Sequence, residues 1–229
     1  MLFQNRAAAG FRLAGELRVL ENRDDVIVLA LPRGGVPVGY EVATALRLPL
    51  DVLVVRKIGL PGYPELAVGA LASNGVLVFS EEVGWRRLGA TPEAIAPVIA
   101  AERAELRRRE RLFREDRPIP DLHDKTVILV DDGVATGSTM EAAVLAARQG
   151  LAPGHAAPKQ IIVAVPVGTE ETCRRLEQVA DEVVCLENPP DFDAVGQFYT
   201  DFHQLTDEEV QIILRKARIC PPHLLSRAA

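Results

Sequence analysis

The stretch from Thr126 to Thr139, TVILVDDGVATGST, constrains the fold of this chain more than any other. Its first five residues are mostly β-branched and apolar, the composition of a strand that is buried on both faces. Two carboxylates, Asp131 and Asp132, follow where such a strand would end. The sequence MEAAVLAARQG then has a helical pattern, with Gly150 as its stop signal. The stretch therefore predicts a strand, a turn and a helix, as in a parallel α/β sheet.

The turn between the acid pair and this helix has the features of an anion site. Residues 133–139, GVATGST, combine glycines that let the backbone approach a ligand with hydroxyls and the positive end of a helix dipole. The GxxxxGK[ST] spacing of a Walker loop is absent. Two adjacent carboxylates repel a phosphate unless they hold sugar hydroxyls or a divalent cation. A ligand with a phosphate, a diol and a metal-bound anion fits these groups, and two ordinary helix-capping acids are the alternative.

The other apolar runs complete an α/β pattern. Residues 25–31 and 51–55 read as buried strands, with a helix over 38–48 between them. This unit and the one over 126–150 together predict a parallel sheet with right-handed crossovers. Further elements are expected as helices over 5–22 and 91–117, strands over 160–168 and 182–186, and a final helix opened by the capping box of Thr206 and Glu209.

Two more loops have chemical features. LPRGGVP (31–37) places two glycines and Arg33 at a strand end, where they suit an anion; alone, it would read as a tight turn. RKIGLPGYP (56–64) holds two glycines and two prolines in nine residues, which predicts a mobile excursion without packing periodicity. The runs 65–71 and 76–79 then read as a hairpin around the turn signal at 73–75.

Composition narrows the class of protein. The 229 residues are 48% hydrophobic and 25% charged, as in ordinary globular chains. A net charge of −6 disfavours nucleic acid as a partner. The three cysteines form no CxxC motif, which favours a reduced, cytoplasmic chain without structural zinc. The sequence also predicts no membrane span, because no apolar run is long enough.

Motifs along most of the chain resemble those of type I phosphoribosyltransferases. The acid-pair stretch VILVDDGVATGST is similar to the signature with which that family binds phosphoribosyl pyrophosphate (PRPP). LPRGG, VRKIG, AVPVG, an N-terminal FxNRxxAG pattern and a VGQFYTDF tail are similar to those of a group of predicted phosphoribosyltransferases. The resemblance implies a Rossmann-like parallel sheet in a single domain, 1–229, with a core of about 23–186 and a small hood built from 1–22 and 187–229.

The resemblance also implies an activity and its residues. The enzyme would transfer the 5-phosphoribosyl group of PRPP to a nitrogenous acceptor, with Mg²⁺ and release of pyrophosphate. A non-catalytic PRPP-binding regulator and a Mg²⁺-dependent phosphohydrolase are the alternatives, and a homodimer stays open. The residues implied for binding ribose 5-phosphate are Asp131, Asp132, Gly133, Val134, Ala135, Thr136, Gly137, Ser138 and Thr139, and of these Asp131 and Asp132 are also implied to be catalytic and to lie near the metal. Those implied for pyrophosphate are Arg33, Gly34, Gly35, Arg56 and Lys57, and of these Arg56 and Lys57 are also implied to be catalytic. Those implied for the acceptor are Val134, Val167, Phe198 and Tyr199.

Two further expectations come from the resemblance. The family's pyrophosphate loop often holds a non-proline cis peptide, here expected at Pro32–Arg33 or its neighbour. Ala135 stands where transferases for 6-oxopurines carry an acid, so a hypoxanthine or guanine enzyme of that type is disfavoured. The identity of the acceptor stays open.

Overall fold

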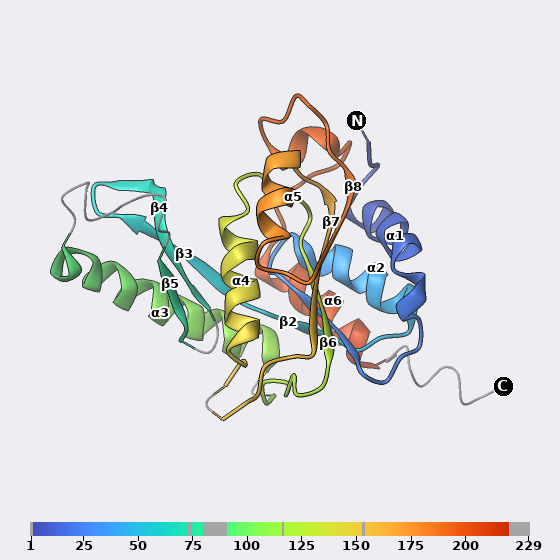
Figure 1. Ribbon diagram of the computed structural model, residues 1–229, viewed down its shortest axis with the longest axis horizontal. Helices are drawn as coiled ribbons and strands as arrows, with labels where there is room; N and C mark the ends of the chain where they lie inside the picture. Colours follow the sequence, from blue (N-terminus) through green and yellow to red (C-terminus); the bar gives the residue numbers. More distant parts are fainter. Residues whose placement is uncertain (1, 73–74, 80–90, 116, 153, 220–229) are drawn as a thin grey trace.

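A five-stranded parallel sheet forms the centre of the molecule (Figure 1). The computed structural model describes residues 2–72, 75–79, 91–115, 117–152 and 154–219. The strand order is β2-β1-β6-β7-β8, and each neighbouring pair is parallel. The strands are β1 (Val26–Ala30), β2 (Leu50–Val52), β6 (Thr126–Val130), β7 (Gln160–Val167) and β8 (Glu182–Glu187). The prediction of an α/β fold with a parallel sheet is confirmed.

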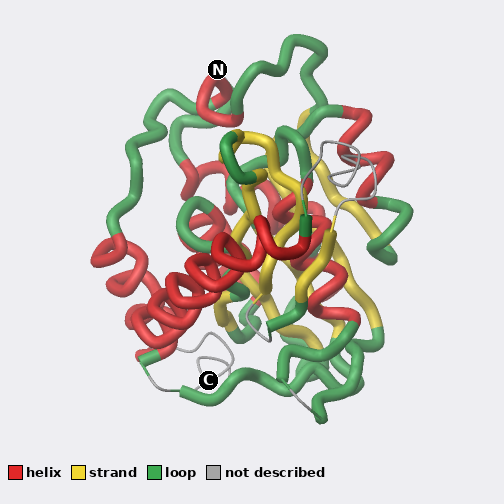
Figure 2. Tube along the Cα trace, turned by 90° about the vertical axis from the view of Figure 1, so that its left-hand side faces the viewer, coloured by secondary structure: helices red, strands yellow, loops and turns green. Residues whose placement is uncertain are grey.

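Helices cover both faces of this sheet (Figures 1 and 2). Alternate residues of each strand point to opposite faces, so the apolar runs of β1 and β6 supply two cores. Leu29 and Leu129 pack with α4 and α5 on one face, and Val28 and Ile128 pack with α1 and α2 on the other. The helices are α1 (Arg6–Glu16), α2 (Gly35–Leu46), α3 (Pro92–Arg114), α4 (Ser138–Arg148), α5 (Glu170–Leu176) and α6 (Asp207–Ile219).

Helix α1 begins at an Asn5 cap and is shorter than expected. The Asn5 side chain accepts a hydrogen bond from the amide of Ala8, and after Glu16 the chain makes a short 3₁₀ turn, Arg18–Leu20. Leu13 and Leu17 are buried, as the helical pattern predicts, but Phe11 is 70% exposed. The face of α1 that meets α2 carries Gly10, where a Cβ would lie 2.6 Å from the Val38 carbonyl oxygen.

A second, antiparallel sheet projects from the main body with α3 beside it (Figure 1). Its strands are β3 (Val55–Leu60), β4 (Tyr63–Ala72) and β5 (Leu77–Phe79), and β4 pairs with β5 as the hairpin prediction required. The interpretation of 56–64 as an unpacked excursion was wrong. Ile58 and Leu60 are buried at a spacing of two residues, against α3 residues that include Ile95. The glycines and prolines concealed this strand pattern.

The N-terminal segment packs against the segment around residues 198–202, which precedes α6. Phe3 pairs with Tyr199 in a short parallel bridge, and main-chain bonds of 2.9–3.0 Å join residues 2 and 3 to Phe198. Phe192 and Phe202 pack against the same apolar cluster. This cluster lies beside the end of β7, since it includes the buried Val167. Among the described residues, no helix combines the length and the hydropathy that crossing a bilayer requires.

Candidate functional site

Asp131 and Asp132 lie at the carboxyl end of β6, directly against the loop that follows β1. Leu31 donates to the carbonyl of Val130 over 2.9 Å, which continues the pairing of the two strands. A Cβ on Gly34 would lie 2.0 Å from Asp132 Oδ2, and one on Gly35 would lie 2.5 Å from the Val130 carbonyl oxygen. Only glycine fits at either position. The acid pair and the basic-Gly-Gly loop are therefore in direct contact at this edge of the sheet.

The peptide bond between Pro32 and Arg33 is cis, at the first of the two positions expected. The loop then passes into α2, which begins at Gly35. A guanidinium nitrogen of Arg33, Nη1, lies 3.8 Å from Asp207 Oδ1 at the start of α6. An element near the end of the chain thus holds the charged side chain of this loop.

The turn 133–137 delivers the chain into the N-terminus of α4. Its Val134 amide donates to the Val167 carbonyl over 2.9 Å, and Gly137 has a φ of +71°, which favours glycine. The hydroxyl of Thr172 donates to the Ala135 carbonyl, and Arg175 donates to the Thr136 carbonyl. These carbonyls are therefore occupied on the side of α5, while the first-turn amides of α4 have no acceptor within the helix. The turn has the geometry of an anion cradle.

The two acids differ in their surroundings. Burial, followed by the negative charge of Asp132, raises the pKa of Asp131 well above the usual range of an aspartate. Burial also raises the pKa of Asp132, against the opposing effect of Arg6, whose Nε donates to Asp132 Oδ2 over 2.8 Å. The hydroxyl of Tyr199 donates to the main-chain carbonyl of Asp132 over 2.5 Å. Residues from both ends of the chain therefore contact Asp132.

The two basic residues at the start of β3 face different ways. Adjacent residues of a strand point to opposite sides of the sheet. Arg56 pairs with Glu102 of α3 at 2.6 Å, on the side of the buried Ile58. Lys57 is exposed, and its positive charge lowers the pKa of Asp131. The structure therefore holds Arg56 against α3 and leaves Lys57 exposed on the opposite side of the strand.

A family model, described as a phosphoribosyl transferase domain, matches residues 2–203. The chain belongs to the phosphoribosyl transferase family. This match includes the acid pair, both loops and the pairing of the chain ends at Phe3 and Tyr199.

Similar proteins agree with this membership. Two Mycobacterium tuberculosis proteins, from strains CDC 1551 and H37Rv, are 45% identical to this chain over 216 residues and are named phosphoribosyl transferases provisionally. The match covers 94% of this chain and 47% of each relative, so the chain spans about half of their length. The crystal structure of the protein TT1426 from Thermus thermophilus is 42% identical, with a TM-score of 0.78, and the match covers 94% of this chain and 99% of TT1426.

The four residues expected to contact the acceptor are all buried. Val167 is fully covered, and Val134, Phe198 and Tyr199 are 8% exposed or less. Phe198 and Tyr199 belong to the cluster that joins the chain ends, and Val134 packs in the sheet core. The structure thus gives these side chains packing roles. A contact with the acceptor stays a prediction, and it requires neighbouring groups to move.

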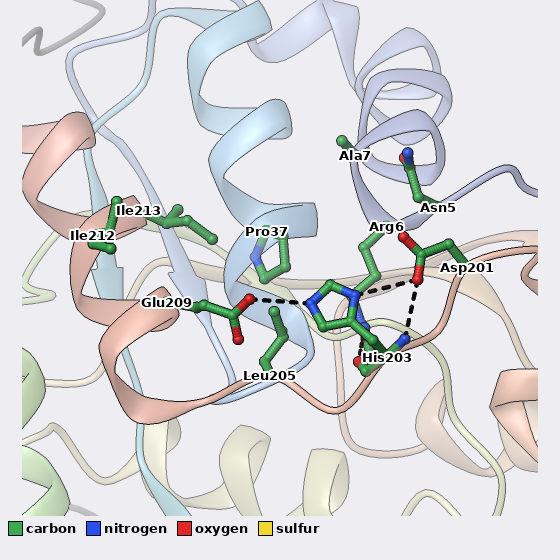
Figure 3. A pocket seen from close by; sticks show the side chains of 10 residues that line it. All are labelled: Asn5, Arg6, Ala7, Pro37, Asp201, His203, Leu205, Glu209, Ile212 and Ile213. Carbon is green, nitrogen blue, oxygen red and sulfur yellow. Dashed lines mark hydrogen bonds and ion pairs between the residues drawn. The ribbon is translucent and has the colours of Figure 1, made fainter.

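A cavity among the described residues is lined by Arg6, the side chain that also contacts Asp132, and its lining includes neither acid of the pair (Figure 3). It has a volume of about 330 Å³ and lies between the start of α1, the start of α2, the loop 201–205 and α6. His203 lines it, 3.2 Å from both Asp201 Oδ1 and Glu209 Oε1, and these two contacts raise the pKa of the imidazole (Figure 3). Arg6 lines the cavity and also reaches Asp132.

The donor set of this phosphoribosyl transferase fits Mg²⁺ that is held mainly by its substrate. No group of three or more His, Cys, Asp or Glu side chains that could hold a metal lies within the described ranges. Mg²⁺ keeps several waters and is commonly bound by one or two carboxylates together with substrate phosphates. Asp131, a buried carboxylate beside a second acid, suits that role, because a cation would relieve its unfavourable charge.

The structure shows three side-chain contacts at the site that were not predicted from the sequence. Arg6, Tyr199 and Asp207 contact Asp132 or Arg33 from distant parts of the chain. The signal for Arg6 was its place in the N-terminal pattern, since a charged residue on an otherwise apolar helix face needs a buried partner. Neither Tyr199 nor Asp207 carried a sequence signal for this contact.

Proposed function

We propose that this chain transfers the 5-phosphoribosyl group of PRPP to a nitrogenous acceptor and releases pyrophosphate. The observation that carries the proposal is the meeting of three parts at one edge of the sheet: the acid pair, the Arg33-Gly34-Gly35 loop and the N-terminal turn of α4. A diol, a pyrophosphate and a 5′-phosphate are the three parts of PRPP. In parallel α/β sheets, ligands bind outside the carboxyl ends of the strands.

Each part has a binding role in this proposal. The amides and hydroxyls of 133–139 hold the 5′-phosphate, since a helix N-terminus and its preceding turn favour an anion. Asp131 accepts hydrogen bonds from the ribose hydroxyls. The Arg33 guanidinium and the backbone of the glycine loop hold the pyrophosphate. Mg²⁺, when bound, neutralises charge on the pyrophosphate and makes it a better leaving group.

The protein's own residues then favour the transition state. As the bond from the anomeric carbon to pyrophosphate breaks, positive charge develops on the ribose ring. In this proposal the carboxylate of Asp131 stabilises that charge, as preorganised groups do in other active sites. Lys57 approaches from β3 and balances the negative charge that collects on the leaving group. The β3–β4 hairpin carries Lys57, and its closure would keep water from the reactive ribose.

The limits of the domain form part of the same proposal. The family match covers residues 2–203, and the curated relatives are about twice as long as the matched region. We propose one phosphoribosyltransferase domain over 1–229, with a core of about 23–186 and a hood formed by 1–22 and 187–229. The main-chain bonds between residues 2–4 and 198–201 support such a hood. The activity of any longer protein that contains this domain lies outside this proposal.

The test is incubation with PRPP, Mg²⁺ and a panel of nucleobases while pyrophosphate is measured. Release that depends on an acceptor supports the transferase. Saturable PRPP binding without turnover supports a regulator, and phosphate release from unrelated esters supports a phosphohydrolase; either result contradicts the proposal. Asp131→Asn should abolish release. Asp124→Asn is the matched control, because that carboxylate is 89% exposed and pairs only weakly with His123 at 3.6 Å.

A further inference from the structure

Arg6 makes three different contacts from a buried position. Its Nε donates to Asp132 Oδ2 over 2.8 Å and its Nη1 donates to the His203 carbonyl over 2.9 Å. Its guanidinium carbon lies over the Phe202 ring, 3.8 Å from the ring centre. The side chain is only 10% exposed. These contacts join the start of the chain, the tail and the end of β6 at one cation.

As a result, the two carboxylates of the acid pair have different hydrogen-bond partners. Asp132 is held by Arg6, and its Oδ2 lies 2.0 Å from the position that a Cβ on Gly34 would take. The carboxylate of Asp131 accepts only the main-chain amide of Asp132, over 2.9 Å, among the hydrogen bonds of the described residues. One acid is thus engaged with protein on its Arg6 side, and the other keeps most of its capacity to accept hydrogen bonds.

We infer that Arg6 is a positioning residue that divides the labour of the acid pair. It holds and neutralises Asp132, so that Asp132 anchors the two chain ends over the sheet edge and Asp131 takes the ribose diol. This inference rests on the proposed function, and it names which of the two acids contacts the sugar. It also explains how two adjacent carboxylates stand beside an anion site, since Arg6 compensates the charge of one of them.

The geometry requires arginine. A guanidinium donates in several directions from a rigid plane and also stacks on an aromatic ring, whereas an ammonium is a compact charge without that plane. Arg6→Lys therefore keeps the charge and loses part of the orientation. Arg6→Gln loses both, and it leaves Asp132 without its cation next to the second acid.

The first experiment measures PRPP binding in the presence of Mg²⁺ by calorimetry. Arg6→Gln should weaken binding about tenfold or more, because a charge-assisted contact that orders the site is lost. Arg6→Lys should fall between Gln and wild type. Arg12→Gln is the matched control on the same helix. Arg12 pairs with Glu187 at 2.7 Å and lies over Phe3, but it is 48% exposed, and its hydrogen bonds and ion pairs within the described residues include neither acid. Equal binding by the Arg6 variants and this control would overturn the inference.

The second experiment needs no ligand. Urea unfolding of Arg6→Gln, Asp132→Asn and the double variant forms a double-mutant cycle. The midpoint of the double variant should fall by clearly less than the sum of the two single changes, because each single change leaves a buried group without its partner. Purely additive changes would overturn the inference. If wild type bound no PRPP, the proposed function would fail, and the cycle would still decide whether Arg6 holds Asp132.

The division of labour is tested by comparing the two acids directly. Asp131→Asn should lose PRPP binding in both the wild-type and Arg6→Gln backgrounds. Asp132→Asn should weaken binding less in the Arg6→Gln background than in the wild type, since its partner is already absent there. A greater loss from Asp132→Asn than from Asp131→Asn in both backgrounds would contradict the assignment of the ribose diol to Asp131.

Discussion

Replacing Gly34 with alanine tests whether the glycine loop and the acid pair are packed as one site. Gly34 has φ −60° and ψ −36°, a right-handed conformation that alanine adopts freely. Any effect of the substitution therefore comes from space. The new Cβ would lie 2.0 Å from Asp132 Oδ2 and 2.5 Å from its Cγ, so one of the two groups must move by about 1 Å.

The expected loss of stability follows from the contacts that this movement breaks. Overpacking a close contact costs about 1–3 kcal/mol. Moving the carboxylate also disrupts its 2.8 Å bond with Arg6, and a hydrogen bond to a charged group contributes about 1.5–3 kcal/mol. Together these give a loss of roughly 3–5 kcal/mol. For a chain of this size that loss corresponds to a fall in melting temperature of roughly 6–20 °C.

Gly15→Ala is the control. Gly15 lies near the end of α1, and a Cβ there meets no atom within 4 Å. Alanine in a helix is favoured over glycine by about 0.5–1 kcal/mol, so this variant should melt at a slightly higher temperature than wild type. Thermal unfolding followed by circular dichroism measures both variants, and calorimetry measures their PRPP binding. A Gly34→Ala protein that melts like wild type and binds PRPP equally would refute the packing argument.

Three other predictions concern single side chains. Lys57→Ala should lower the rate of pyrophosphate release strongly with little change in melting temperature. Arg56→Ala should lower the melting temperature modestly, because its ion pair with Glu102 is lost. Similar rates of pyrophosphate release for the two variants would contradict the different roles given to Lys57 and Arg56. Burial places the pKa of Asp131 in the folded state above its unfolded value of about 3.9, so wild-type stability falls as pH rises from that value toward the folded pKa. The stability gain of Asp131→Asn should therefore grow as pH rises above about 4 in urea unfolding, and a difference that stays constant with pH would contradict this prediction. Tyr199→Phe removes the donor to the Asp132 carbonyl and should destabilise the protein by about 1 kcal/mol, measured in the same assay; an unchanged midpoint would mean that the bond contributes nothing.

The main sheet could be predicted because its strands are buried on both faces. Runs such as 126–130 and 160–167 are almost continuously apolar, and strands of that composition are typical of a parallel sheet that is covered on both faces. The β3–β4 hairpin was misread because its buried residues, Ile58 and Leu60, alternate with a glycine and are followed by Pro61 and Gly62. Local turn signals outweighed a two-residue period that tertiary packing later satisfied.

Some parts of the candidate site could likewise be predicted from the sequence, and others could not. The acids, the turn and the glycine loop are each contiguous in sequence, so motif spacing could find them. The contact of Arg6 with Asp132 spans 126 positions, and the fold alone brings the two together. The different roles of Arg56 and Lys57 also required the structure, because opposite faces can be assigned only after the segment is known to be a strand.

The central claim is that PRPP binds at the sheet edge formed by the acid pair, the glycine loop and the α4 turn. Calorimetric titration of the protein with PRPP and Mg²⁺, without an acceptor, tests it most directly. We expect saturable binding at one site, lost in Asp131→Asn, preserved in Asp124→Asn and greatly weakened when Mg²⁺ is removed with a chelator. No binding by the wild-type protein, or equal binding by Asp131→Asn, would contradict the claim.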